Sequence, residues 1–267
     1  MQQKMPINAH VRAHYNQHMQ TCSQVHRDSL MKYNNLVKKK IITDATKRNT
    51  RGEVYETKKR RRNKDKVVEC SILDVGCGRG GDLFKWAHCN ISNYVGVDIS
   101  DASIEEAKNR SKKISDVEFD FHIMPIEKFF KSLDKNTKYN IISLQFVLHY
   151  IIDSMDSLEQ LIDCCRQHLN TDGVIIGTIV NSQEACKYLS KESKENNHQR
   201  YFNLRPLPFQ DKKNVELGFM YEFFLHNCVN NCIEFIVPWN DIEVTTAKYG
   251  MQIDYVTSFV DLSLIHI

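Results

Sequence analysis

The segment Ile72-Leu-Asp-Val-Gly-Cys-Gly-Arg-Gly-Gly-Asp82 constrains the fold more than any other part of the chain. Its apolar start predicts a buried strand, and the residues after the glycines predict the beginning of a helix. Gly76, Gly78 and Gly80 allow the backbone to turn sharply and to approach a ligand closely, which a Cβ atom would prevent. A strand, a glycine-rich turn and a helix in this order are typical of a nucleotide-binding α/β fold.

Short β-branched runs alternate with longer amphipathic runs, which predicts a parallel sheet with helical crossovers. The expected strands are Cys70–Val75, Tyr94–Ile99, Val117–Ile123, Tyr139–Leu144 and Val174–Val180. The expected helices are Ser29–Ile42, a short helix through Leu83 and Trp86, Asp101–Ile114, Asp156–Leu169 and Asp241–Tyr249. An antiparallel pair, Phe219–Leu225 with Ile233–Val237, and a last strand, Ile253–Val260, are expected near the C-terminus. The expected fold is therefore α/β and doubly wound, with a mostly parallel sheet, an N-terminal helical extension and a small antiparallel β insertion.

Composition divides the chain into two expected parts. Residues 1–66 are expected to form a helical extension that ends in a basic linker or loop from Thr43 to Lys66, and residues 67–267 the α/β domain. A substrate-binding insertion is expected at about residues 190–240, and its polar start, Ser190–Gln199, is expected to be mobile.

Positive charge is concentrated in one segment. The chain has 36 Lys and Arg against 33 Asp and Glu, but residues 38–66 alone contain 13 basic and 4 acidic residues. Three interpretations of this segment remain open: a path for the phosphates of RNA, a nuclear localisation signal, or a solvated loop. The residues concerned are Lys58, Lys59, Arg60, Arg61 and Arg62.

Nine scattered cysteines indicate reduced thiols, and hence the nucleus or the cytoplasm, with the nucleus slightly favoured. No metal site is expected, because Cys228 and Cys232 have no second ligand pair at zinc-finger spacing. The N-terminus lacks the apolar region of a signal peptide, and polar residues interrupt the apolar stretch Ile141–Ile152. Neither secretion by that route nor membrane insertion is therefore expected.

Two acidic residues indicate the chemistry of the cofactor. Asp98 ends the second expected strand, about 20 residues after the glycine-rich turn, where its carboxylate can accept both ribose hydroxyls of an adenosine. Asp74 precedes the first glycine; its charge would repel a pyrophosphate but would attract an ammonium or sulfonium group. S-adenosylmethionine is therefore favoured over NAD or FAD, which remain alternatives together with an ordinary glycine-rich turn that binds nothing.

Six blocks of sequence, in the same order, give the chain a resemblance to the messenger RNA cap guanine-N7 methyltransferases, a family of class I S-adenosylmethionine-dependent methyltransferases. The blocks are VRAHYN (Val11–Asn16), YNNLVKK (Tyr33–Lys39), ILDVGCGRGGDLFKW (Ile72–Trp86), YVGVDIS (Tyr94–Ser100), SLQFVLHY (Ser143–Tyr150) and NNCIEFIV (Asn230–Val237). The glycine-rich block alone would indicate only a class I methyltransferase of Rossmann-like fold. The last two blocks are the specific ones.

The resemblance implies two sets of contacts. The cofactor contacts would be Lys38, Asp74, Gly76, Asp82, Asp98 and Gln145. The cap-guanine pocket would contain Phe146, His149, Tyr150 and Glu234. Aromatic faces would stack on guanine and attract the positive charge that methylation creates. Glu234 would accept hydrogen bonds from the guanine N1–H and amine, and His149 would donate one to the carbonyl oxygen.

The implied reaction transfers a methyl group to N7 of the guanine of a 5′ RNA cap by in-line displacement, leaving S-adenosylhomocysteine. Neither a general base nor a metal is expected, because neutral N7 carries a free lone pair and the product loses no proton. Other capping domains or subunits are possible partners. Two alternatives remain: a methyltransferase for another nucleic acid or small molecule, and a weakly active or inactive subunit of a capping complex.

The sequence departs from the family pattern at three places. Pro125 stands where the family generally has an acid that contacts the adenine amine, so a backbone contact from Ile126 is expected instead. Val180 replaces a family proline after the fifth strand, and Phe259–Ser263 lacks the C-terminal aromatic residue of the cap pocket. A chain truncated at its C-terminus, or one that belongs to a longer capping protein, would explain the last departure.

Overall fold

A computed structural model describes residues 7–17, 27–59, 70–89, 91–190, 202–209, 215–226 and 228–264. The chain forms two compact units, each built from three separate segments. The parallel-sheet unit comprises Lys32–Gln145, Cys164–Gly177 and Thr257–Ile267. The antiparallel-sheet unit comprises Met1–Met31, Phe146–Asp163 and Thr178–Val256.

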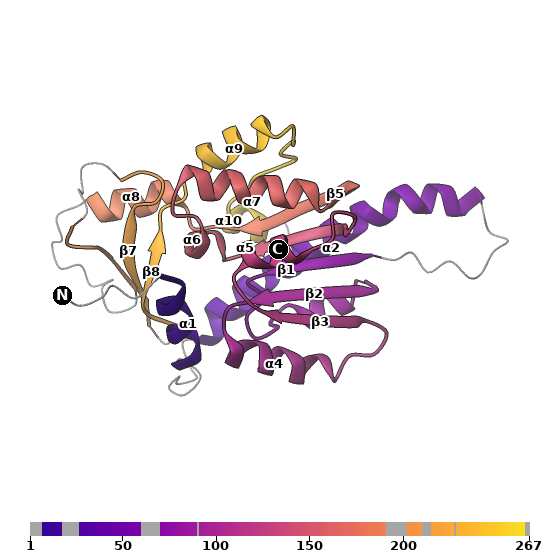
Figure 1. Cartoon of the computed structure of the whole chain (residues 1–267), viewed down its shortest axis with the longest axis horizontal. Helices are drawn as coiled ribbons and strands as arrows, with labels where there is room; N and C mark the ends of the chain where they lie inside the picture. The colour runs from indigo at the N-terminus through magenta and orange to yellow at the C-terminus, as the bar shows by residue number, and fades with distance from the viewer. Residues whose placement is uncertain are drawn as a thin grey trace. The chain divides into compact units, whose positions relative to one another are not determined.

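The parallel-sheet unit contains a five-stranded sheet in the order β3-β2-β1-β4-β5 (Figure 1). Its strands are β1 (Ser71–Val75), β2 (Asn93–Asp98), β3 (Glu118–Ile123), β4 (Tyr139–Gln145) and β5 (Leu169–Thr178). The pairs β1–β2, β1–β4 and β2–β3 are parallel. Ile72, Leu73 and Ile141 are fully buried, as expected of central strands that are covered on both faces. The expected doubly wound α/β fold is confirmed.

Five helices accompany this sheet: α2 (Arg27–Lys59), α3 (Leu83–Ala87), α4 (Asp101–Ser111), α5 (Ile126–Ser132) and α10 (Phe259–Leu264). Helix α7 (Met155–Gln167) contributes residues to both units, and so does α2, because its residues up to Met31 belong to the antiparallel-sheet unit. Helix α4 begins where predicted, because the Ser100 hydroxyl accepts the Ser103 N–H at 3.1 Å and Asp101 places an acid in the first turn. It lies against β2 and β3 (Figure 1).

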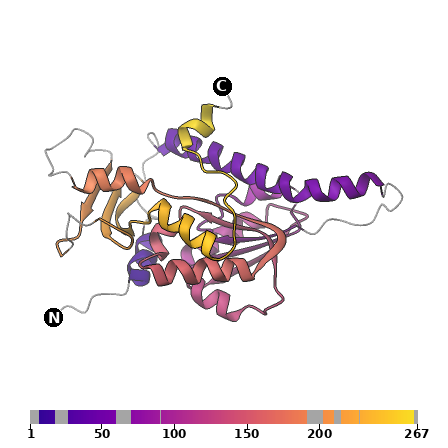
Figure 2. The ribbon, with the colours of Figure 1, turned by 90° about the horizontal axis from the view of Figure 1, so that it is seen from above.

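The expectation of a loop from Thr43 onward is wrong, because helix α2 continues to Lys59 (Figure 2). Ile42, Ala45 and Thr46 are buried, so the apolar face of the helix extends past the predicted end. The following residues are mostly Lys, Arg, Glu and Thr without proline, and Lys, Arg and Glu favour a helix wherever nothing interrupts it. Residues 60–66 lie outside the described part of the chain.

The antiparallel-sheet unit contains a three-stranded sheet, β6-β7-β8, formed by β6 (Phe202–Pro206), β7 (Met220–Leu225) and β8 (Val229–Phe235). The predicted antiparallel pair is confirmed as β7 and β8, and Tyr221 lies opposite Glu234. The helices of this unit are α1 (Ile7–Gln17), α6 (Leu148–Ile151), α8 (Ser182–Ser190) and α9 (Trp239–Lys248). Leu189, Phe219 and Tyr221 belong to its core. The segment expected to be mobile lies, apart from Ser190, outside the described residues.

The expected last strand, Ile253–Val260, is wrong. Residues 251–258 have no regular structure, and helix α10 begins at Phe259. Tyr255 and Val256 are 58% and 57% exposed. Because these apolar side chains stay mostly uncovered, the alternating pattern does not produce a strand. Ser258 instead starts the helix, because its hydroxyl accepts the Asp261 N–H at 3.1 Å.

Within the described ranges, no helix combines the length and the apolar character needed to cross a bilayer. Eight cysteines fall in these ranges, and all eight are free thiols.

Candidate functional site

The glycine-rich turn after β1 has the geometry that its sequence predicts. Gly76, Gly78 and Gly80 have φ angles of 67°, 52° and 68°, in the left-handed region that favours glycine. A Cβ atom on Gly80 would lie 2.4 Å from the Leu83 side chain, so this position also has no room for one. The Gly76 N–H donates to the Val97 carbonyl at 2.8 Å, which ties the turn to β2.

Asp98 ends β2 and holds the turn from the other side. One carboxylate oxygen accepts the Gly78 N–H at 2.9 Å and the other accepts the Ser100 N–H at 2.8 Å. Burial raises the pKa of Asp98, although these backbone donors oppose the effect. Each oxygen keeps a further lone pair, so the carboxylate can also accept two hydroxyl groups.

Asp74 is a buried acid with a neutral partner. It is 3% exposed, and the Tyr94 hydroxyl donates to it at 2.7 Å. Burial, assisted by the nearby negative charge of Asp82, raises the pKa of Asp74 to about 6. A cationic ligand would stabilise this carboxylate, so the position suits an ammonium or sulfonium group.

Asp82, in contrast, lies between two cations. Lys38 donates to one of its oxygens at 2.9 Å and Lys85 to the other at 2.7 Å. Burial alone would raise the pKa of Asp82, but the two lysines together hold it below its ordinary value. Sequence reasoning missed Lys85, although its place three residues after Asp82 at the start of α3 was a usable signal.

Gln145 and Ile126 complete the predicted cofactor set. Gln145 is 6% exposed, and neither of its amide atoms has a hydrogen-bond partner among the described residues. Such a buried amide is costly unless a ligand satisfies it. Ile126 is the first residue of α5, where a helix leaves N–H groups without intrahelical acceptors. Both follow or end strands of the parallel sheet, at the edge where such sheets bind ligands.

Glu234 is the centre of a second cluster, in the antiparallel-sheet unit. It is 2% exposed, and each of its carboxylate oxygens accepts a tyrosine hydroxyl, from Tyr150 at 3.1 Å and from Tyr221 at 2.7 Å. The prediction that this buried acid has partners is confirmed. Burial raises the pKa of Glu234 to about 7, although the two phenols oppose the shift.

His149 lies beside this carboxylate, with its Nε2 atom 3.8 Å from Oε1 of Glu234. Burial lowers the pKa of His149 to about 3, so the imidazole is neutral at physiological pH. Its Nδ1 atom has no hydrogen-bond partner within the described ranges. The histidine is therefore able to donate one hydrogen bond and to accept another.

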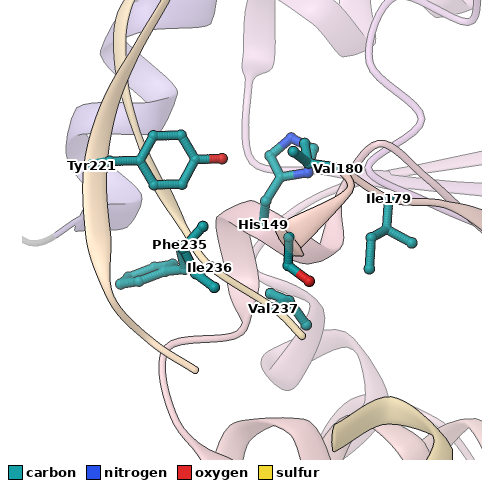
Figure 3. A pocket seen from close by; sticks show the side chains of 8 residues that line it. His149, Ile179, Val180, Tyr221, Phe235, Ile236 and Val237 are labelled. Carbon is teal, nitrogen blue, oxygen red and sulfur yellow. The ribbon is translucent and has the colours of Figure 1, made fainter. Parts of the chain in front are cut away.

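The ring of His149 lines a pocket (Figure 3). The other lining residues are Ile179, Val180, Ser182, Tyr221, Phe235, Ile236 and Val237. The Tyr221 hydroxyl and the His149 ring point toward one another in this view. Val180, the residue that replaces a family proline, is part of the wall.

Phe146 has an unusual backbone conformation for an aromatic residue, with a φ angle of 55°. Its N–H donates to the carbonyl and the hydroxyl of Thr178, both at 3.1 Å, and these bonds hold the strained conformation. Strain of this kind concentrates at functional sites. The structure brings His149 and Tyr150 together with Glu234 and places Phe146 just before α6.

The basic run is the part of the predicted site without a structural description. The backbone of Lys58 and Lys59 ends helix α2, their side chains are not described, and Arg60, Arg61 and Arg62 lie outside the described residues.

Comparison with solved structures identifies the fold. A magnesium protoporphyrin IX methyltransferase from Synechocystis aligns over 97% of this chain and 95% of its own, with a TM-score of 0.52 and 12% identity. An S-adenosylmethionine-dependent methyltransferase from Clostridium acetobutylicum aligns over 72% and 78%, with a TM-score of 0.50 and 18% identity. The fold is therefore that of the class I methyltransferases.

Sequence comparison identifies the family. A family model described as the mRNA (guanine-N(7))-methyltransferase domain matches residues 1–264, and the chain belongs to this family. The mRNA cap guanine-N(7) methyltransferase of Schizosaccharomyces pombe is 30% identical over 199 residues, 72% of this chain and 55% of that protein. The enzyme of the same name from Saccharomyces cerevisiae is 27% identical over 265 residues, 91% and 56% of the two chains. The chain thus spans about half the length of these relatives.

Proposed function

We propose that this chain transfers a methyl group from S-adenosylmethionine to N7 of the guanine of a 5′ RNA cap. The observation that carries the proposal is the buried Glu234, which two tyrosine hydroxyls and a neutral histidine surround. The chain's family membership supports it. The two residue groups also meet in the sequence, because Gln145 of the cofactor set directly precedes Phe146 of the guanine set.

The residues of the parallel-sheet unit suit S-adenosylmethionine at each of its ends. Asp98 would accept the two ribose hydroxyls, and the Ile126 N–H would contact the adenine ring in place of the missing acid. Asp74 would face the amino or sulfonium group, and Lys38, held by Asp82, would reach the carboxylate of the methionine moiety. Gln145 would satisfy its buried amide on the same ligand. When bound, S-adenosylmethionine supplies an electrophilic methyl group.

The residues of the antiparallel-sheet unit suit guanine. As a carboxylate, Glu234 would accept the N1–H and the exocyclic amine, a pair of donors that adenine lacks. Neutral His149 would donate to the guanine carbonyl oxygen, and the rings of Phe146 and Tyr150 would stack on the base. Methylation makes guanine cationic, so attraction to an aromatic face and to a carboxylate increases as the reaction proceeds.

Catalysis would then depend on position rather than on proton transfer. The N7 lone pair is free in neutral guanine, so none of these side chains has to remove a proton. The protein's task is to hold the reacting atoms in line and to keep water away. Capped RNA is the proposed partner. The nucleus is the proposed location, in preference to the cytoplasm, because RNA that receives a cap is made there.

The first test is an assay with labelled S-adenosylmethionine and three RNAs: GpppG-capped, ApppG-capped and uncapped. We expect label only on the GpppG cap, as N7-methylguanosine, and we expect S-adenosylhomocysteine to bind in a calorimetric titration. Binding without transfer to the cap would show that the methyl acceptor is another molecule. The absence of binding would overturn the proposed function and would favour the alternative of an inactive subunit.

A further inference from the structure

We propose that Tyr15 is a positioning residue for guanine recognition, and that it acts through the hydroxyl group of Tyr150. This inference rests on the proposed function. Tyr15 lies on helix α1, within the VRAHYN block and far in sequence from the cluster around Glu234, and neither of the two predicted sets of site contacts includes it.

The directions of the hydrogen bonds carry the inference. A phenol has one proton to donate. The Tyr150 hydroxyl donates that proton to Oε1 of Glu234, at 3.1 Å. The hydroxyl of Tyr15 lies 3.1 Å from the Tyr150 oxygen and donates to it. The chain of donors therefore runs from Tyr15 through Tyr150 to Glu234, and Tyr15 keeps the Tyr150 proton directed at the carboxylate.

The rings reinforce this direction. Tyr15 and Tyr150 meet edge to face, with centroids 5.9 Å apart and an interplanar angle of 87°, so α1 also fixes the plane of the Tyr150 ring. Tyr150 is 8% exposed, which leaves it little freedom to find another partner. A chain of hydrogen bonds in a buried setting also polarises each member, so the Tyr15 proton strengthens the bond that Tyr150 makes to Glu234.

A consequence follows for the carboxylate. Tyr150 and Tyr221 each take one lone pair of Glu234, one on each oxygen. The remaining lone pairs, one on each oxygen, are then left to accept the guanine N1–H and the amine. If Tyr150 lost its fixed direction, the orientation of Glu234 would be held from one side only. Tyr15 would thus affect how tightly guanine binds, and it would leave the methyl-transfer step itself largely unchanged.

The test is a double-mutant cycle of Tyr15→Phe and Tyr150→Phe, measured as kcat and as KM for capped RNA and for S-adenosylmethionine. Phenylalanine keeps the edge-to-face contact and removes only the hydroxyl. We expect Tyr15→Phe to raise KM for capped RNA about three- to tenfold, in line with the loss of one hydrogen bond, with little change in kcat or in KM for S-adenosylmethionine. In the Tyr150→Phe background, the same change should have no further effect.

The matched control is Tyr188→Phe on α8, whose ring packs against Phe202, away from this chain of donors; it should leave all constants unchanged. An unchanged KM for capped RNA in Tyr15→Phe would overturn the inference while leaving the proposed function intact. An equal effect of Tyr15→Phe in both backgrounds would show a general structural role and would also overturn it. A wild-type protein that transfers no methyl group to the cap would overturn the proposed function, and this inference with it.

Discussion

Asp74 and Glu234 are two buried acids, and their hydrogen-bond partners differ from those of carboxylates on the surface. Each accepts tyrosine hydroxyls rather than cations within its own unit. Neutral donors compensate only part of the cost of burying a charge, so the pKa of each acid rises. The burial of these two charges therefore lowers the stability of the free protein, as expected of residues that are proposed to bind a ligand.

Replacing Asp74 with Asn should separate stability from cofactor binding. The folded-state pKa of about 6 lies above the ordinary value of 3.8, so this group favours the folded state only when protonated. Its contribution to stability falls as the pH rises from about 4 to 6, and the penalty is fully present above that range. Asp74→Asn should remove up to about 3 kcal/mol of this penalty at pH 8.

The measurement is urea unfolding at pH 5 and pH 8, combined with titration of S-adenosylhomocysteine. We expect the Asp74→Asn protein to be at least as stable as wild type at pH 8 and to bind the ligand at least tenfold more weakly. Asp134→Asn changes an exposed carboxylate in the same way and serves as the control. A variant that is less stable at pH 8 but binds normally would contradict the role given to Asp74.

Glu234 should give the reaction its pH dependence. Its carboxylate form is the one proposed to accept the guanine donors, and its pKa of about 7 lies above the ordinary 4.5, so this form increases as the pH rises through 7. We expect log kcat/KM for capped RNA to rise with a slope near 1 below this pH and to level off above it. His149 stays neutral throughout this range, because burial holds its pKa near 3.

Initial rates between about pH 5.5 and 8.5 at constant ionic strength would record this profile. Glu234→Gln should lower kcat/KM at least a hundredfold and remove the acidic limb, because an amide cannot accept both donors of the base. Glu243→Gln, an exposed change on α9, should leave the profile unaltered. A flat wild-type profile would mean that Glu234 does not titrate in this range or does not contact guanine.

At the scale of elements, the strands and the turns were the predictable part. The strands β1 to β4 were located to within one residue, because β1, β2 and β4 are largely buried apolar runs and β3 alternates apolar and polar residues. Strand β5 begins at Leu169, five residues before the predicted Val174. The length of α2 and the missing strand near the C-terminus were not predictable in this way. In both cases the outcome depends on what packs against the segment: a covered face extends α2, and an uncovered one leaves residues 251–258 irregular.

The site residues also fall into a group that could be predicted from the sequence and a group that could not. Asp98 and the glycines could be located because their types and spacing are unusual for a strand or a turn, and Glu234 because its block resembles the family. Tyr15 and Tyr221 could not, because tyrosine is common and only the folded chain shows which partners these residues have. Lys85 does have a local signal, its spacing of three residues from Asp82, which the prediction did not use. The proposed cofactor contact of Ile126 remains a prediction.

The turn after β1 allows a comparison between two adjacent glycines. Gly80→Ala should destabilise the protein by about 2 kcal/mol or more, because the φ of 68° is unfavourable for alanine and its Cβ would meet Leu83. Gly81 has no atom within 4 Å of the equivalent position and has an ordinary φ, so Gly81→Ala should change stability by about 0.5 kcal/mol or less. Urea unfolding of both variants checks this, and equal losses would show that the turn does not require a left-handed residue at position 80.

At the scale of the whole molecule, positive charge is unevenly distributed. Residues 38–66 carry a large share of the basic groups of a chain whose net charge is only +3. If the end of this segment follows the RNA, affinity for capped RNA should fall steeply with salt, and replacing Lys58, Lys59, Arg60, Arg61 and Arg62 with Gln should reduce that dependence.

The slope of log affinity against log salt is the quantity to measure, with wild type and the five-fold Gln variant side by side. Each phosphate contact removed should lower the slope by about 0.7 for single-stranded RNA. We expect a decrease of at least about 1.4, the value for two contacts. An unchanged slope would leave the localisation signal and the solvated loop as the remaining interpretations of the run.

Each unit is assembled from three stretches of the chain, and the antiparallel-sheet unit takes its first stretch from the N-terminal 31 residues. The residues proposed to bind the cofactor and those proposed to bind guanine therefore do not occupy two consecutive parts of the sequence. A single crossover between residues 32 and 234 in the genes of two relatives would combine parts of both units from each parent, and would separate Tyr15 from the glutamate that it is proposed to orient. Exchange of base preference between relatives would need three coordinated grafts, with the N-terminal helix among them.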